Sequence, residues 1–374
     1  MPVRVCFMID SLSRAGTETQ LLALIRSLDR ERVVPSLVLL DGMSDDSQAL
    51  EPLDCPVLRL GLQSLVGRST TSAIATLAGF WRRQRVDVLQ TYFLDSTYFS
   101  LPLARVCGIR QTIRVRNNLG YWLTDRHRRL GRLMGRLATC TLTNSEDGKR
   151  AIMQAERLHP EKIVVIENGV DLDRFDVRPL PSRQQVGIVA NLRAVKNIDG
   201  LIRAVANVRD CFPTMHLNIA GEGEQRQELE RLIAERGLSE SVTLHGAVSD
   251  VPEFLAKQDI AVLCSHSEGM SNAVLEYMAA GRPVLATDVG ANAQLVRHGV
   301  DGIIVPAGDG AALTAGLLNL LGDPTHAVPM SANARKRVET HFSRQAMVAR
   351  FESFYGKLAF RRKRTSRSTT RSTL

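Results

Sequence analysis

Aromatic residues, cysteine pairs and long apolar runs are scarce or missing in this sequence. Aromatic residues make up only 5% of the 374 residues and no nucleic-acid-binding signature is present, so we expect no nucleic-acid partner. The six cysteines stand singly and far apart, which predicts no local metal or redox site and is typical of a reducing, cytoplasmic compartment. No apolar run reaches the length of about eighteen residues that would predict a membrane-spanning helix.

Acidic residues are missing where basic residues are most concentrated. The formal net charge is +9, and six basic residues without an acidic one fall in residues 361–374, so the remainder of the chain is nearly neutral. This segment of mostly Ser, Thr and Arg predicts a basic disordered tail. A second stretch, 105–136, holds nine arginines and a single acidic residue. Such clusters either contact an anionic membrane peripherally, here the inner face of a plasma membrane, or are simply solvated.

Short apolar runs alternate with helical patterns along the chain, which is typical of an α/β fold with parallel sheets covered by helices on both faces. A segment with two prolines and no periodicity, 176–182, interrupts this alternation. We therefore predict two doubly wound, Rossmann-like domains, at 1–176 and 183–339, and an amphipathic helix at about 340–359. Because open parallel sheets bind ligands at the carboxyl ends of their strands, we expect the ligand in a central cleft that the two domains face.

The most informative stretch, 267–284, follows a predicted strand. The loop at the end of that strand contains Glu268, Gly269 and Met270. Ser271 or Asn272 is expected to cap the next helix, whose free amides and dipole suit a diphosphate. Glu276 lies about two turns further on, where a hydroxyl-rich group such as ribose is a more suitable partner than a phosphate. Taken alone, each glutamate could equally belong to a solvated helix face.

The string from Glu268 through Glu276 to Val284 resembles the signature of glycosyltransferase family 4, which contains retaining enzymes of the GT-B fold. Further segments that resemble the family cover most of the chain: 163–171, 186–197, 218–224, 244–246 and 301–309. The resemblance implies that the first domain binds the acceptor and the second the nucleotide sugar. It also implies that the last helix crosses back onto the first domain.

The resemblance implies a role for individual residues. Catalytic roles fall to Arg193, Lys196 and Glu268; donor-binding roles fall to Gly16, Gly221, Gly223, Val248, Gly269, Met270, Ser271, Asn272 and Glu276. Arg193 and Lys196 stand three residues apart at the start of a predicted helix, so both cations can face one departing diphosphate. Glu268 would hold hydroxyls of the donor sugar. Outside this context, Arg-x-x-Lys is usually surface charge.

Two first-domain positions depart from the family pattern. Many members carry histidines where this chain has Gln90-Thr91-Tyr92 and the segment 114–118. Retaining transfer in the family is thought to need no dedicated protein base, because the leaving phosphate oxygen accepts the proton of the acceptor hydroxyl. Arg116 and Asn117 are then candidates for acceptor or phosphate contact. The other interpretation is an Asn-Asn turn beside a solvated arginine.

Two motifs resemble a dinucleotide-binding site and a metal-binding site, but neither has the pattern or the position that such a site requires. Gly221-x-Gly223 begins a dinucleotide fingerprint, but Arg226 occupies the third glycine position. Asp171-Leu172-Asp173 is an acid-x-acid pair typical of a different glycosyltransferase fold, and at a domain boundary we expect it to be a structural turn. We therefore expect neither a metal nor a cofactor.

The sequence predicts a retaining glycosyltransferase that moves a sugar from a UDP- or GDP-sugar to a glycan or lipid-linked acceptor, in envelope or exopolysaccharide synthesis. Two alternatives stay open. One is a non-catalytic adaptor that binds a nucleotide sugar, and the other is a sugar epimerase or phosphorylase of the same fold.

Overall fold

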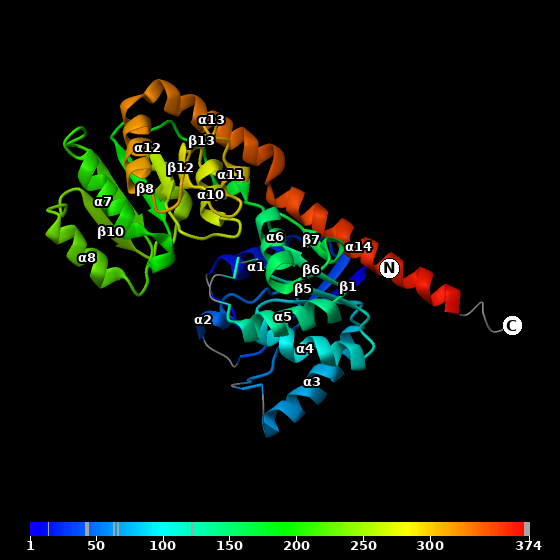
Figure 1. Cartoon of the computed structure of the whole chain (residues 1–374). Coiled ribbons are helices and arrows are strands. Elements are labelled where there is room, and N and C mark those ends of the chain that lie inside the picture. The colour runs from blue at the N-terminus through cyan, green and yellow to red at the C-terminus, as the bar shows by residue number, and fades with distance from the viewer. Residues whose placement is uncertain are drawn as a thin grey trace. The chain divides into compact units, whose positions relative to one another are not determined.

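The computed structural model describes residues 1–13, 15–41, 45–62, 64–65, 67–117, 119–120 and 123–369. Asn118 and residues 370–374, which the sequence analysis named, lie outside the described residues. The chain divides into two compact units, the first made of Met1–Glu167 with Arg344–Leu374 and the second of Asn168–Ser343 (Figure 1). The boundary at Glu167 precedes the proline-containing segment 176–182, which belongs to the second unit.

The first unit contains a seven-stranded parallel sheet in the order β3-β2-β1-β4-β5-β6-β7. Its strands are β1 (Val3–Ile9), β2 (Val33–Leu39), β3 (Val57–Arg59), β4 (Val88–Thr91), β5 (Gln111–Val115), β6 (Cys140–Thr143) and β7 (Ile163–Val165). Its helices are α1 (Gly16–Ser27), α2 (Asp45–Gln48), α3 (Arg68–Gln84), α4 (Leu94–Val106), α5 (Asp125–Leu137), α6 (Glu146–Glu156) and α14 (Arg344–Thr369).

Alternate residues of β1 enter two different apolar clusters, as the period of two in a strand requires. Phe7 packs in a cluster with α1 and α14, and its ring contacts Tyr355 edge-on at 6.3 Å between centroids. Cys6 and Met8 pack in a second cluster with residues of α3 and α4. The first sheet is therefore covered on both faces, and α14 is part of its core.

The second unit contains a six-stranded parallel sheet in the order β10-β9-β8-β11-β12-β13. Its strands are β8 (Gln185–Val189), β9 (His216–Ala220), β10 (Val242–Gly246), β11 (Ile260–Leu263), β12 (Val284–Thr287) and β13 (Gly302–Val305). Its helices are α7 (Ile198–Val208), α8 (Arg226–Glu235), α9 (Val251–Ala256), α10 (Asn272–Ala279), α11 (Asn292–Leu295), α12 (Gly310–Gly322) and α13 (Pro324–His341). The predicted α/β class with two Rossmann-like sheets is confirmed.

The predicted C-terminal helix differs from the structure at both ends. Phe342, which falls within the predicted helix, instead follows the last turn of α13 and packs in the core of the second unit. Its carbonyl accepts a hydrogen bond from the Val170 amide at 2.9 Å. The helix of the first unit, α14, begins at Arg344 and continues to Thr369, so the predicted tail 361–374 starts inside it. Arginine and lysine are good helix formers, which lets the helix extend beyond Leu358, a buried residue of the apolar cluster.

Candidate functional site

The carboxyl ends of β8 and β11 form the centre of the candidate donor site. These two strands are neighbours, while the chain leaves β8 toward β9 on one side and β11 toward β12 on the other. At such a switch point the connecting loops diverge and leave a crevice, which is where open α/β sheets bind ligands. The loop after β8 carries Arg193 and Lys196, and the loop after β11 carries Glu268.

Lys196 and Glu268 form an ion pair although 72 residues separate them in sequence. The Nζ atom of Lys196 lies 2.6 Å from Oε1 of Glu268, and the hydroxyl of Ser265 donates to the same oxygen at 2.7 Å. The side chains are only 21% and 12% exposed, so the interaction is stronger than a surface pair. The two loops are also joined by a backbone bond of 2.8 Å from the His266 amide to the Val195 carbonyl.

The turn that carries Arg193 and Lys196 is tighter than predicted. Ala194–Lys196 form a 3₁₀ turn, and α7 begins only at Ile198. The cause is Asn197, which adopts a left-handed φ of 53° and donates its side-chain amide to the Cys264 carbonyl at 3.2 Å. The Arg193 guanidinium is exposed, and no ion pair is recorded for it among the described residues.

The loop before α10 is held on both sides. Ser271 caps the helix by accepting a hydrogen bond from the Val274 amide at 3.3 Å, as predicted for one of two candidates. Asn168 donates its backbone amide to the Met270 sulfur at 3.2 Å and its side-chain amide to Asn272 at 2.8 Å. A Cβ atom on Gly290 would collide with the carbonyl oxygens of Glu268 and Gly269. This packing fixes the amides at the start of α10, which suit an anion.

Glycines 221 and 223 are required by close backbone packing. Gly221 has a φ of +150°, and a Cβ atom there would collide with the Ala190 carbonyl oxygen. A Cβ atom on Gly223 would collide with the carbonyl oxygen of Leu192, whose amide donates to the Glu222 carbonyl at 2.9 Å. Both glycines therefore keep the loop after β9 against the loop after β8.

Glu276 is half-buried on α10. Burial raises the pKa of its carboxyl to about 7, and the charge of Arg174 opposes that rise. No hydrogen bond to this carboxyl is recorded within the part of the chain that the structure describes. Val248 follows β10 and packs against the apolar cluster that contains Phe254.

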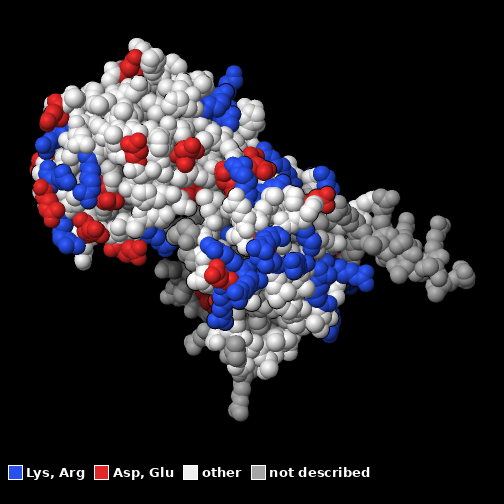
Figure 2. All heavy atoms as spheres, viewed as in Figure 1, with Lys and Arg blue, Asp and Glu red and all other residues white. Residues whose placement is uncertain are grey.

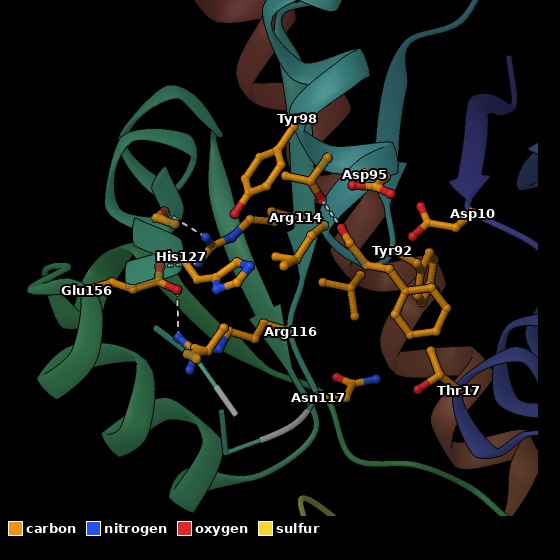
Figure 3. Close-up of a pocket in the computed structure, with 16 residues that line it drawn as sticks. Asp10, Thr17, Tyr92, Asp95, Tyr98, Arg114, Arg116, Asn117, His127 and Glu156 are labelled. Atoms are coloured by element: carbon orange, nitrogen blue, oxygen red, sulfur yellow. Dashed lines mark hydrogen bonds and ion pairs between the residues drawn. The ribbon is translucent and has the colours of Figure 1, made fainter. Parts of the chain in front are cut away.

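A pocket of about 410 Å³ lies at the switch point of the first sheet, between the ends of β1 and β4 (Figure 3). Asp10 follows β1, and its carboxylate accepts two hydrogen bonds from Ser96, from the amide at 2.8 Å and from the hydroxyl at 2.5 Å. Burial is the main cause of a raised pKa at Asp10. Arg116 and Asn117, predicted on the acceptor side, both line this pocket. Gly16 begins α1, whose Thr17 lines the same pocket.

Arg116 is buried and ion-paired, which contradicts the interpretation of this residue as a solvated arginine beside a turn. Its Nη1 lies 2.6 Å from Oε1 of Glu156, and Nη2 of Arg114 lies 2.5 Å from the other oxygen of the same carboxylate. The three side chains are 9%, 5% and 3% exposed. This cluster forms one wall of the pocket.

Among the residues that the structure describes, no group of three or more His, Cys, Asp or Glu side chains is placed to hold a metal ion. Asp171 and Asp173 belong to a 3₁₀ turn around Leu172–Arg174. Within the described residues, no helix is long and apolar enough to cross a membrane.

Two family models together match nearly the whole chain. One described as glycosyltransferase family 4 matches residues 14–174, and one described as glycosyl transferases group 1 matches residues 171–337. The chain belongs to glycosyltransferase family 4.

Individual proteins agree with this membership. The chain is 30% identical over 244 residues to an MMP α-(1→4)-mannosyltransferase of Mycolicibacterium hassiacum, covering 63% of this chain and 57% of the relative. It is 28% identical over 209 residues to a lipopolysaccharide core biosynthesis mannosyltransferase, LpcC, of Rhizobium leguminosarum, covering 52% and 59%. The match thus spans little more than half the length of these curated relatives. The crystal structure of HepE from Anabaena in complex with UDP has a TM-score of 0.84 at 20% identity, covering 95% of this chain and 100% of that one, which shows the GT-B fold.

The segment Gln90-Thr91-Tyr92, where the sequence analysis noted a departure from the family pattern, belongs to a buried hydrogen-bonded network. Gln90 accepts a hydrogen bond from the Tyr355 hydroxyl at 2.9 Å and donates one to the Tyr92 hydroxyl at 2.7 Å. Tyr92 lines the pocket, so α14 is connected to the pocket wall through Gln90.

Four residues of the two sites escaped the sequence analysis: Ser265, Asp10, Arg114 and Glu156. Asp10 carried a usable signal, because a carboxylate directly after the first strand of a parallel sheet lies at its ligand-binding edge. Ser265 carried none, because its role depends on the direction of one hydroxyl.

The arginine-rich stretch 105–136 is divided between interior and surface. Arg114 and Arg116 are buried in the pair with Glu156, so they do not contribute to a basic surface. Exposed arginines remain at 105, 110, 126, 128, 129 and 136. Figure 2 shows Lys and Arg side chains gathered on the face of the first unit that carries α5 and α6.

Proposed function

We propose that this chain is a retaining glycosyltransferase that transfers a sugar from a UDP-sugar to a glycan or lipid-linked acceptor. The observation that carries the proposal is the Lys196–Glu268 pair beside the start of α10, at the switch point of the second sheet. A cation, a carboxylate and the amides at the start of a helix converge there, which are the groups that a nucleoside diphosphate sugar needs.

Each group of the donor has a partner of matching chemistry. Lys196 keeps two of its three N–H donors for the diphosphate, and the exposed Arg193 adds a second cation as charge grows on the leaving oxygen. Glu268 uses Oε1 for Lys196 and Ser265, which leaves Oε2 to accept hydrogen bonds from sugar hydroxyls. Glu276 accepts bonds from ribose hydroxyls. Because the two cations and the amides at the start of α10 together bind the diphosphate, we expect the reaction to require no metal or cofactor.

The choice of UDP over GDP is supported by HepE, whose crystal structures hold UDP and UDP-glucose. The choice of a glycan or lipid-linked acceptor is supported by the relative named for lipopolysaccharide core biosynthesis. The acceptor would bind in the pocket of the first unit, where Asp10 and Asn117 offer partners for hydroxyls. The leaving phosphate oxygen would accept the proton of the attacking hydroxyl. Protein and acceptor would meet at the inner face of the membrane, through the exposed arginines of the first unit.

A panel of UDP-, GDP- and ADP-sugars tests the donor. A donor present at 100 times its dissociation constant stabilises the folded chain by about 2.7 kcal/mol, which a thermal shift detects. Failure of every nucleotide sugar to shift the unfolding temperature would contradict the proposal. Binding without turnover would favour the adaptor, and conversion of the sugar without transfer would favour the epimerase.

Glu268→Gln tests the catalytic pair. We expect turnover to decrease by at least about 100-fold, because a charged contact to the reacting sugar is lost at nearly constant volume. Glu230→Gln is the matched control, since that carboxylate forms an exposed pair with Arg226 in the same unit at 2.9 Å. Equal turnover in the two variants would remove Glu268 from the mechanism.

A further inference from the structure

The pocket of the first unit contains buried polar atoms that have no hydrogen-bond partner among the residues that the structure describes. Buried polar groups are normally hydrogen-bonded, so each exception calls for an explanation. Four residues lining this pocket contribute such atoms: Tyr98 its hydroxyl, Arg114 its Nε, Arg116 its Nη2 and Asn117 its Oδ1. Three of the four are N–H or O–H donors, which predicts that the missing partner is an acceptor.

The charges of the same wall do not cancel. Arg114 and Arg116 share the single carboxylate of Glu156, and the remaining bond from Arg114 Nη1 goes to the neutral carbonyl of Gly131 at 2.7 Å. Two guanidinium groups and one carboxylate leave one positive charge. On this wall, a bound anion would pair with the positive charge that Glu156 does not neutralise. Burial also lowers the pKa of Arg116, even though Glu156 opposes this effect.

The opposite wall of the pocket carries negative charge. Figure 3 shows Asp10, Asp95 and Tyr92 across the pocket from Arg114 and Glu156, with the Tyr98 hydroxyl turned toward the Arg114 guanidinium. The carboxylates of Asp10 and Asp95 can accept hydrogen bonds from hydroxyls, but they repel an anion. A ligand that fits both walls therefore has an anionic group at one end and hydroxyls at the other.

We propose that the pocket binds an acidic acceptor, a sugar whose carboxylate or phosphate pairs with Arg114 and Arg116. This inference rests on the proposed function, since it names the chemical class of the acceptor of that same reaction. The anion accepts hydrogen bonds from the Tyr98 hydroxyl and the two guanidinium groups, while the sugar hydroxyls reach Asp10 and Asp95. His127 also lines the pocket on the side of the two arginines.

Calorimetric titration without any donor tests the inference on the full chain. The probes are methyl β-glucuronide, glucose 1-phosphate and neutral methyl β-glucoside. We expect at least one anionic probe to bind about tenfold or more tightly than the glucoside, as a charge-assisted hydrogen bond implies. The two anionic arms decide between carboxylate and phosphate. Equal affinity for all three probes would overturn the inference.

Two variants change the charge of the wall in opposite directions. Arg116→Gln should weaken the preferred anion, whereas Glu156→Gln, which removes the competing carboxylate, should tighten it. A merely structural role predicts weaker binding in both variants, and that result would contradict the inference. Arg150→Gln is the matched control, because this arginine is exposed on the same unit and pairs with Asp147.

Tyr98→Phe keeps the inference testable if the charge variants do not fold. The Tyr98 hydroxyl has no hydrogen-bond partner within the described part of the chain, so its removal should leave the unfolding temperature unchanged. Affinity for the anion should nevertheless decrease by about tenfold. Unchanged affinity would count against the site. Binding of UDP-glucose to the same preparation separates the two proposals: if the nucleotide binds and the anions do not, only this inference fails.

Discussion

Glu276 provides a direct test of the donor site, because its carboxyl titrates near neutral pH. Burial raises its pKa to about 7, and Arg174 is the charged group that opposes the rise. If ribose hydroxyls donate to this carboxyl, they stabilise its ionised form. Nucleotide-sugar binding must then release a proton wherever the free carboxyl is protonated.

The size of the effect follows from that pKa. The free carboxyl is about nine-tenths protonated at pH 6 and about one-tenth protonated at pH 8. We therefore expect release of nearly one proton on binding at pH 6, and an apparent dissociation constant about tenfold larger at pH 6 than at pH 8.

The assay is calorimetric titration with UDP-glucose at pH 6, in two buffers of different ionisation enthalpy. A nucleotide sugar is suitable because its diphosphate is esterified at both ends and does not titrate in this range, unlike free UDP. The slope of the observed heat against buffer ionisation enthalpy gives the number of protons released. Glu276→Gln is the control, and its slope should be close to zero.

Stability offers a second measurement with a defined sign. Because the folded pKa of Glu276 lies above the ordinary value of 4.5, its contribution to stability is fully present below about pH 4.5 and is lost as the pH rises to 7. Glu276→Gln should remove this pH dependence. Binding heats that do not depend on the buffer, or the same slope in the variant, would refute the assignment of Glu276 to the donor.

Further predictions concern metal, membrane and the last helix. Sugar transfer should persist in excess EDTA, because cationic side chains and helix amides bind the diphosphate; loss of activity that manganese restores would indicate that Asp171 and Asp173 hold a metal. Anionic vesicles should bind the chain, with attachment weakened in about 0.5 M salt and by removal of 361–374, and salt-insensitive sedimentation would contradict this. Removal of 361–374 should leave the unfolding temperature unchanged, since the apolar contacts of α14 end at Leu358. A chain that ends at Ser343 should be insoluble or inactive, because it lacks the helix that covers Phe7, and a soluble active product would disprove that role.

The strands were predictable where burial on both faces produces a continuous apolar run. The segments Val3–Ile9 and His216–Ala220 of the sequence coincide with β1 and β9 for this reason. β3 (Val57–Arg59) is half-buried along its whole length, so its three residues carry no such run.

The donor site was predictable because topology brings distant residues together. Lys196 and Glu268 follow β8 and β11, and the switch point makes the ends of these strands neighbours. The exact turn was not predictable, since it depends on the left-handed conformation of Asn197. Helical spacing therefore placed Arg193 and Lys196 at the start of a helix, whereas the structure places them around a 3₁₀ turn that precedes α7.

Two separate features of the sequence pointed to the arginine-rich wall of the first pocket, but they do not form one motif. Arg114 and Arg116 are two residues apart where β5 leaves the sheet, which places both side chains on one face. Glu156 is the last residue of α6, where a carboxylate opposes the helix dipole and therefore needs a cationic partner. What no pattern contains is the ratio of two arginines to one glutamate, because the chain must fold before these three side chains meet. The leftover positive charge is the feature that selects an acceptor, so acceptor chemistry had to come from the folded structure.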